Sequence, residues 1–376
     1  MYWHTTYGEI NLVEQVYYRK GVGIRIRPFS ESAHVHCRGY SLPLQRAISD
    51  FGGEEAFGQV EQKLREHYGI GAPTSSVRVI TERHATKIRE WQENNPKKKA
   101  RKISLAIVET DGSMVPIVQQ KRVDGEGKID RRKNKEYVYK EARLSLARGA
   151  GFITPVFAAT MDGVNNVGQQ LEECVEKIGG HAKTKVHAVG DGAPWIAIQV
   201  EERFGANGKF LLDFYHVCEY LSKAAEVCAQ GSPRAWLELQ KTRLKTGRLE
   251  ETLRELFAYR ESSEIEDEKA PVRGCYRYLT NRLTQLHYKE TLEQDLPIGS
   301  GEVESAHRYV IQERLKIAGA WWDIEHAKDM LALRVCSANQ EWVDYWSSRE
   351  CSSNCVSIII AVPNLSGRQN KFAAEK

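Results

Sequence analysis

A change of pattern near Ile103 constrains the fold of this chain more than any other feature of its sequence. Before this point, apolar residues recur at helical spacing. After it, two apolar runs at 103–108 and 114–118, separated by Asp111-Gly112, predict two strands with a turn between them. A third strand is expected over 137–146, after a loop rich in basic residues.

The same region then alternates helical patterns with apolar runs. The sequence predicts a helix over 164–178 that ends at Gly179-Gly180, a strand over 185–189, a helix from Pro194 and a short strand over 210–212. Three strands followed by this alternation indicate a mixed sheet with helices on its faces. The expected class is therefore α/β, in the outline of an RNase H-like fold.

Helical patterns flank the sheet region on both sides. Apolar residues at helical spacing over 57–68, a Gly-containing turn and a second helical pattern from Thr74 predict a helix-turn-helix unit, and a plain helical hairpin is the alternative. In a helix-turn-helix, the second helix enters the DNA major groove, where Arg78, Arg83 and Lys87 would meet DNA.

These patterns divide the chain into six expected parts. They are an N-terminal region (1–96), a basic linker (97–102), the first part of the catalytic core (103–214), an all-helical insertion (215–298), C-terminal helices that complete the core (299–346) and a tail (347–376).

The charge of the chain permits a nucleic-acid partner without demanding one, because a formal net charge of +4 is only mildly basic. The basic residues gather in two clusters, at 97–102 and 121–135. The N-terminus lacks the layout of a signal peptide, and no apolar run approaches the roughly 20 residues of a membrane span. We therefore expect a cytoplasmic protein without a membrane partner.

Two carboxylates stand where apolar strands are expected to end beside glycine. Asp111 precedes Gly112, and Asp191 lies between Gly190 and Gly192. Mg²⁺ prefers such oxygen ligands, and two metals can stabilise both oxygens of an in-line phosphoryl displacement. Glu304, in the first turn of a helix expected after Gly299-Ser300-Gly301, is the candidate third ligand; Glu302 and Asp213 are its rivals.

Five motifs in a fixed order carry a resemblance to a known group. The motifs are Gly190-Asp191-Gly192-Ala193-Pro194-Trp195-Ile196, Asp213-Phe214-Tyr215-His216, Gly299 to Ser305, Asp111 to Pro116, and Arg314-Leu315-Lys316. Together they resemble the signatures of bacterial insertion-sequence transposases of the DDE type with a mutator-like arrangement. The resemblance implies a catalytic triad of Asp111, Asp191 and Glu304, with Asp213 and His216 in support.

The resemblance also implies an activity and its partners. We expect magnesium-dependent DNA cleavage and strand transfer, with Mn²⁺ able to substitute, by a homo-oligomer that binds element ends and target DNA in the nucleoid. Other residues expected to bind DNA are Arg131, Arg132, Lys133, Arg314 and Lys316. Two alternatives stay open: an RNase H-like nuclease without strand transfer, and a catalytically silent DNA-binding protein derived from a transposase.

Overall fold

The computed structural model describes residues 2–18, 25–32, 39–94, 102–121 and 134–354. The chain forms two compact units, one of residues 1–46 with 343–376 and the other of residues 47–342. No helix in the described ranges has both the length and the apolar character that a membrane crossing needs.

The smaller unit contains two short hairpins and parts of three helices. Its strands are β1 (Tyr2–Thr5) with β2 (Gly8–Asn11) and β3 (Tyr17–Tyr18) with β4 (Arg25–Ile26), and its helices are α1 (Pro28–Ser32), the first residues of α2 (Leu42–Glu54) and most of α15 (Trp342–Asn354). The expected tail from residue 347 therefore begins within a helix, α15.

In the larger unit, two helices precede the sheet with the spacing expected of a helix-turn-helix or a helical hairpin. The helix α3 (Phe57–Tyr68) ends at Gly69, which has a φ of 68° and donates its amide hydrogen to the last turn of α3. This left-handed cap suits glycine. The second helix, α4 (Thr74–Asn94), packs against α3 and against α14 (Ile324–Ala338).

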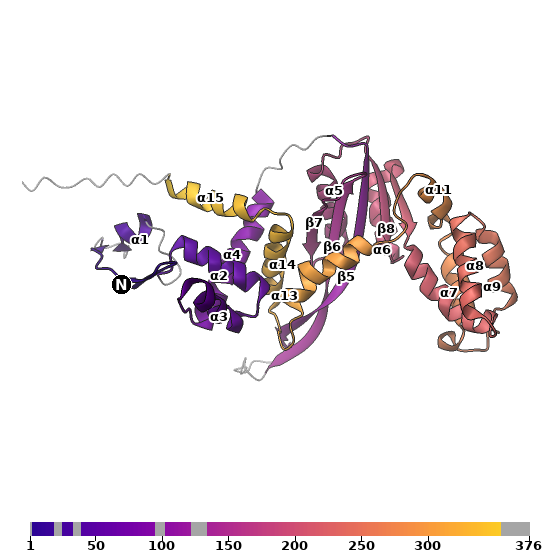
Figure 1. Cartoon of the computed structure of the whole chain (residues 1–376), viewed down its shortest axis with the longest axis horizontal. Coiled ribbons are helices and arrows are strands. Elements are labelled where there is room, and N and C mark those ends of the chain that lie inside the picture. The colour runs from indigo at the N-terminus through magenta and orange to yellow at the C-terminus, as the bar shows by residue number, and fades with distance from the viewer. Residues whose placement is uncertain (1, 19–24, 33–38, 95–101, 122–133, 355–376) are drawn as a thin grey trace, which may run out of the picture. The chain divides into compact units, whose positions relative to one another are not determined.

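Five strands form one mixed sheet in the larger unit (Figure 1). They are β5 (Leu105–Gln120), β6 (Lys135–Gly149), β7 (Val156–Thr160), β8 (Lys185–Gly190) and β9 (Gly208–Leu212), in the spatial order β7-β6-β5-β8-β9. The first three strands along the chain are antiparallel neighbours, whereas β8 and β9 run parallel to β5. The predicted mixed α/β architecture is thus confirmed.

The predicted turn at Asp111-Gly112 is wrong. The strand β5 runs unbroken through both residues, which pair with Leu144 and Arg143 of β6. Asp-Gly is a common turn pair in sequence, but fifteen consecutive residue pairs between β5 and β6 hold the backbone extended here. The strand β7 was not predicted, because Pro155 directly before it weakens the strand pattern.

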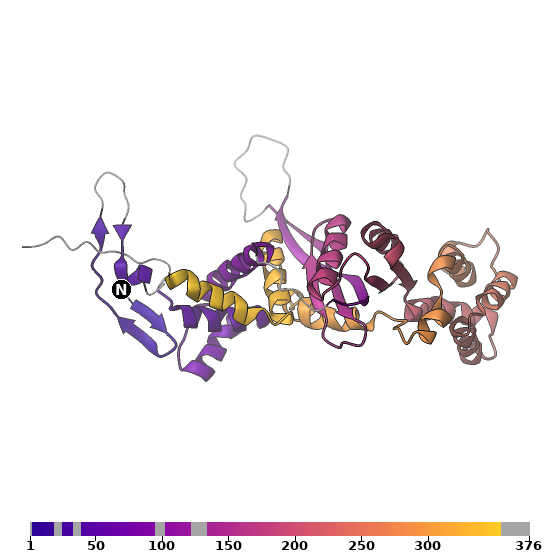
Figure 2. The same cartoon turned by 90° about the horizontal axis from the view of Figure 1, so that it is seen from above.

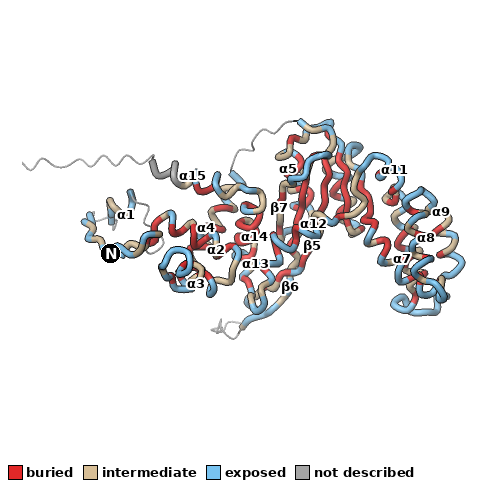
Figure 3. Tube along the Cα trace, in the orientation of Figure 1, coloured by how far each residue is buried: buried red, intermediate tan, exposed pale blue. Residues whose placement is uncertain are grey.

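Helices cover both faces of the sheet, and the residues of β5 alternate between them. Ala106 and Val108 share a buried apolar cluster with residues of α5 (Val164–Lys177) and α6 (Pro194–Phe204) on one face. On the other face lies a helical run of α12 (Gly301–His307), a π-helix η4 (Arg308–Gln312) and α13 (Glu313–Leu315) (Figure 3). Alternation directs Ile107 and Glu109 toward this second face.

Residues 214–300 contain helices and no strand. The helices are α7 (Phe214–Cys228), α8 (Pro233–Lys245), α9 (Leu249–Ala258), η2 (Asp267–Lys269), α10 (Pro271–Thr280), η3 (Leu283–Gln285) and α11 (Tyr288–Glu293). In Figure 2, the helices in the pink-to-orange colours of this stretch lie together beyond one edge of the sheet. We call residues 214–298 the helical segment; it starts where β9 ends and returns the chain to the sheet at α12.

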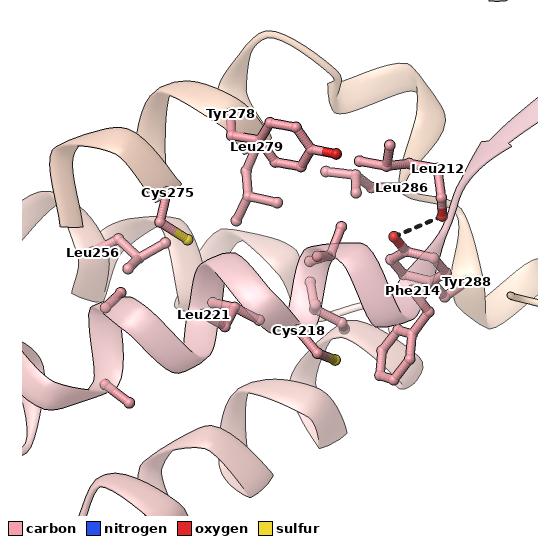
Figure 4. Close-up of a cluster of buried hydrophobic side chains, with 14 of the residues drawn as sticks. Leu212, Phe214, Cys218, Leu221, Leu256, Cys275, Tyr278, Leu279, Leu286 and Tyr288 are labelled. Carbon is pink, nitrogen blue, oxygen red and sulfur yellow. Dashed lines mark hydrogen bonds between the residues drawn. The ribbon is translucent and has the colours of Figure 1, made fainter. Parts of the chain in front are cut away.

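The helical segment has its own apolar core. Leu221, Leu256 and Leu279 are fully buried within it (Figure 4). The hydroxyl of Tyr288 donates a hydrogen bond of 3.0 Å to the carbonyl oxygen of Leu212, the last residue of β9. The core therefore reaches the edge of the sheet and joins the segment to it.

Candidate active site

Asp111 and Asp191 lie at equivalent positions on neighbouring parallel strands. Glu109 of β5 is opposite Val189 of β8, and each aspartate comes two residues later in its chain. Because side chains repeat every two residues along a strand, Asp111 belongs to the face that α12 covers, where His307 of α12 lies 3.5 Å from its carboxylate. Asp191 follows Gly190, the last residue of β8, so it also lies at the carboxyl edge of the sheet.

The loop that carries Asp191 is held by its own turn and by α10. Its carboxylate accepts a hydrogen bond of 2.9 Å from the amide of Ala193. The Tyr278 hydroxyl donates to the carbonyl oxygen of Asp191 at 2.9 Å, and Arg282 Nη2 donates to that of Gly192 at 2.9 Å. Gly192 has a φ of +84°, and a Cβ there would lie 2.4 Å from a methyl group of Leu212. Only glycine fits this turn without strain.

Asp111 is partly exposed and has few protein partners. Its Oδ1 accepts the amide hydrogen of Gly112 at 2.7 Å. Its Oδ2 lies 3.5 Å from Nε2 of His307, and the side chain is 34% exposed. The carboxylate is therefore partly accessible to solvent.

Glu304 projects from the first turn of α12 and is exposed to solvent. Burial, and then the negative charges of Asp213 and Asp111, raise the pKa of its carboxyl. Contacts of the same helix with β5, from the Val303 amide to Glu109 and from His307 to Asp111, place α12 on the Asp111 side of the sheet.

The two alternative candidates for the third metal ligand, Glu302 and Asp213, are both hydrogen-bonded to other parts of the protein. Glu302 accepts two hydrogen bonds from Nε of Arg148, at 2.7 and 2.8 Å. Asp213 is 1% exposed; it accepts the amide hydrogens of Tyr215 and His216, and both the amide and hydroxyl hydrogens of Ser300. Asp213 thus caps α7 and fastens the loop before α12.

His216 lies beside this group. Its side chain is 37% exposed, with Nδ1 4.0 Å from a carboxylate oxygen of Glu219. The positive charge of a protonated His216 lowers the pKa of Glu304.

The structure adds two residues that the sequence analysis missed. His307 is buried with its Nε2 toward Asp111, and neither ring nitrogen makes a hydrogen bond. Glu109 is 1% exposed; its Oε2 accepts the Val303 amide hydrogen at 2.9 Å, and burial raises its pKa to about 8. The three-residue spacing from Glu304 to His307, one helical turn, was the available signal for the histidine.

The residues expected to bind DNA have different surroundings. On α4, Arg78 and Arg83 are exposed and Lys87 is half-buried. Lys316 is exposed on the α12 face, with Nζ 3.3 Å from the Ser113 hydroxyl. Arg131, Arg132 and Lys133 lie outside the described residues.

Arg314 is not available to DNA in this structure, contrary to expectation. It is 2% exposed, and its Nε donates a hydrogen bond of 2.9 Å to the carbonyl oxygen of Gly52 near the end of α2. Its guanidinium also stacks over Phe57 and Trp322. A guanidinium can satisfy helix-terminal carbonyls and pack on aromatic rings, and here both interactions bury it.

Within the described ranges, no three His, Cys, Asp or Glu side chains form a group that could hold a metal ion. Asp111, Asp191 and Glu304 are therefore not gathered closely enough to form such a group.

A family model described as "Uncharacterised protein family (UPF0236)" matches residues 74–345. The match covers most of the chain, which therefore belongs to this family. Two UPF0236 proteins of Caldanaerobacter subterraneus subsp. tengcongensis are 30% and 28% identical, over 156 and 157 residues. Each match covers 41% of this chain and 31% of the relative, so the chain matches about a third of the relatives' length. The second relative's name joins eleven locus designations.

Two solved structures show slight likeness. The "Drosophila P element transposase strand transfer complex" has a TM-score of 0.28 and 10% identity, with 81% of this chain and 80% of that chain covered. The "Crystal structure of NurA" has a TM-score of 0.12 and 16% identity, with 72% and 63% covered. Neither likeness is large enough to support an inference about this chain.

Proposed function

We propose that this chain is a DDE-type transposase that cleaves DNA and transfers the cleaved strand. One observation carries the proposal. Asp111 lies on β5, on the face covered by the helix that bears Glu304, and Asp191 directly follows the neighbouring parallel strand β8. The rivals Glu302 and Asp213 are engaged by Arg148 and Ser300, which leaves Glu304 as the third carboxylate.

The order of the elements supports an RNase H-like assignment. Three antiparallel strands are followed by a helix, a parallel strand, a second helix and a second parallel strand. The chain then leaves the sheet for the helical segment and returns at α12. We interpret the helical segment as an insertion into the catalytic core.

The chemistry of the three carboxylates suits divalent magnesium, with manganese as a substitute. Magnesium is usually held by one or two carboxylates together with substrate phosphate oxygens. The raised pKa of Glu304 supports this fit, because part of it arises from repulsion by Asp213 and Asp111 that a cation would relieve. Asp111, Asp191 and Glu304 would hold the ion, which would stabilise the charge that develops on the reacting phosphate oxygens.

The other residues of the site would orient these carboxylates and the DNA. His307 lies against Asp111, and Tyr278 restrains the loop of Asp191. Asp213 fastens the loop before α12, with His216 near Glu304. Lys316 is placed to meet a DNA phosphate on the same face, and the α4 residues Arg78, Arg83 and Lys87 would contribute a separate DNA contact.

The name of one relative is consistent with a gene that moves and multiplies within its genome. Eleven locus designations for one protein indicate eleven gene copies in a single genome. A transposase gene is copied with its element, so multiplication within a genome is the expected trace of its activity.

The test is an assay with labelled DNA that carries the inverted repeats flanking the gene. Cleavage and joining are scored separately, with Mg²⁺, with Mn²⁺ and with neither. We expect both products from the wild type with either metal. Cleavage without joining would indicate a nuclease, and binding without cleavage would indicate a silent DNA-binding protein.

A matched pair of variants tests the third carboxylate. Glu304→Gln is expected to lose both products, whereas Glu302→Gln, which disturbs only the contact with Arg148, is expected to keep them. Thermal melting of both variants confirms folding. Equal activity of the two variants would reject Glu304 as a metal ligand.

A further inference from the structure

An aromatic patch lies exposed on the outer half of the β5–β6 ribbon, away from the carboxylates. Tyr137, Tyr139 and Trp321 are 57%, 60% and 40% exposed. The Trp321 ring centroid lies 4.8 Å from that of Tyr137 and 5.8 Å from that of Tyr139. We call these three residues the aromatic patch.

The register of the ribbon explains why the rings share one face. Tyr137 and Tyr139 lie two residues apart on β6, opposite Val118 and Pro116 of β5. Residues directly opposite each other in antiparallel strands point to the same side. Trp321 lies beside them because the next residue, Trp322, is held at the free edge of β5. The backbone of Trp322 forms hydrogen bonds with Pro116 and Val118.

The other face of the same ribbon is closed. Val115 and Ile117 are fully buried there, and Trp322 is 6% exposed. The ribbon is therefore anchored on one side, while the aromatic side carries exposed Met114 as well as the patch. Exposed apolar surface of this kind commonly marks a binding site.

Two lysines are exposed at the outer end of the ribbon. Lys121 and Lys135 are exposed at the ends of β5 and β6. The sequence from 121 to 135 contains seven Lys or Arg residues and three Asp or Glu residues. Aromatic rings beside an excess of basic residues are typical of surfaces that bind single-stranded nucleic acid. The charge excess favours such a polyanion over an apolar protein surface.

We propose that the aromatic patch is a stacking platform for unpaired bases of a DNA strand. The ligand is single-stranded because paired bases in a duplex cover one another's flat faces and present only their edges. Stacking needs no sequence-specific contact, since every base has a flat π-face. The identity of the nucleic acid as DNA rests on the proposed function, which this platform would serve by holding a strand opened near the cleavage point.

The test compares two double variants of the full chain: Tyr137→Ser with Tyr139→Ser, and Tyr137→Phe with Tyr139→Phe. Fluorescence anisotropy measures the binding of a labelled 15-nucleotide single strand and of the matching duplex. We expect the serine variant to bind the single strand about tenfold more weakly or worse, with the duplex changed less than about twofold. The phenylalanine variant retains the aromatic rings and should bind as the wild type does.

Three results would overturn the platform. They are unchanged single-strand binding by the serine variant, equal weakening on single strand and duplex, and loss of single-strand binding in the phenylalanine variant. A fourth contrary result is a wild-type dimer, seen by sedimentation, that the serine variant dissociates without changed DNA binding; it would assign the patch to a second copy of the chain. Melting curves verify that both variants fold.

Failure of the platform and failure of the transposase assignment are distinguishable. If the wild type cleaves DNA but the serine and phenylalanine variants bind alike, the platform is wrong and the enzyme stands. If the serine variant loses single-strand binding but the wild type never cleaves, the platform stands and the transposase assignment is wrong.

Discussion

The sheet face around Asp111 and the group of Asp213, Tyr278 and Tyr288 at the junction with the helical segment differ in how their buried polar atoms are paired. On the sheet face, Oε1 of Glu109 and both ring nitrogens of His307 are buried without a hydrogen-bond partner. At the junction, Asp213 accepts four hydrogen bonds, and the hydroxyls of Tyr278 and Tyr288 each donate one to a strand or loop carbonyl.

Unpaired buried polar groups cost stability, so a fold retains them where they serve another purpose. The difference indicates that the sheet face is arranged for a ligand and that the junction holds it in place. Substitutions on the sheet face should therefore reduce activity more than stability, and substitutions in the helical segment should do the reverse.

The largest effect is expected at Asp191. Asp191→Asn retains the shape of the side chain but removes the anionic oxygen that magnesium requires, so cleavage should fall by roughly 10³-fold or more, about 4 kcal/mol in barrier. The measurement is magnesium-dependent cleavage of labelled element ends, with melting curves for folding. Asp162→Asn is the control, because Asp162 pairs with Lys328 and precedes a helix elsewhere on the sheet. Similar losses in the two variants would remove the case for Asp191.

The second prediction concerns the core of the helical segment. Leu221→Ala empties a fully buried site and should lower the free energy of unfolding by about 3 kcal/mol. Leu239→Ala, at a leucine 42% exposed on α8, should change it by less than about 0.5 kcal/mol. Urea denaturation measures both. A small effect of Leu221→Ala would mean that this core contributes little to stability.

The third prediction concerns His287, whose buried Nε2 has no partner although it lies in the helical segment. Burial, followed by the charge of Lys209, lowers its pKa from 6.5 to about 4. Below pH 6.5 the unfolded chain binds a proton that the folded chain refuses, so stability falls as the pH drops toward 4. His287→Gln should remove up to about 2 kcal/mol of this loss, after allowance for solvent screening. Unfolding at pH 7.5 and 4.5 is the measurement, and identical pH slopes for wild type and variant would contradict it.

The smallest change in stability is expected at His307. His307→Leu replaces a buried ring without hydrogen bonds by an apolar side chain, so the free energy of unfolding should change by less than about 1 kcal/mol. Cleavage should still decline, by about tenfold, because the imidazole that lies against Asp111 is lost. Full activity in this variant would show that His307 has no part in positioning Asp111.

Much of the sheet could be predicted because β8, β9 and the first part of β5 are apolar runs and β6 is rich in strand-forming residues. The strands β5, β6, β8 and β9 were expected near their observed positions, and the helices α5 and α6 were predicted from their apolar spacing, the Gly179-Gly180 end and the Pro194 start. Asp111 and Asp191 were chosen for their places in adjacent strands, and the parallel register of β5 and β8 confirms that adjacency. Their catalytic roles remain predictions.

The predictions that were wrong or absent share a physical cause. A short stretch of sequence does not show which distant residues it will contact in the folded chain. Asp111-Gly112 has the chemistry of a turn, but pairing with β6 keeps it extended. Arg314 has the chemistry of a DNA contact, but the end of α2 and two aromatic rings enclose it. Likewise, nothing in the sequence places Trp321 beside Tyr137, because a backbone bridge at Trp322 brings them together.

Because of the π-helix η4, the number of residues between α12 and α13 should matter for the site as much as their identity. It directly follows α12, which bears Glu304 and His307, and precedes α13, which bears Arg314. A π-turn contains one residue more than an α-turn, and each residue of an α-helix advances the helix by about 100°. Deletion of a single residue from 308–312 would let an unbroken α-helix form, and its two ends would then be rotated relative to each other. With Arg314 anchored at α2, Glu304 would turn away from Asp111, so gene variants that shorten this run should be inactive even when every charged residue is retained.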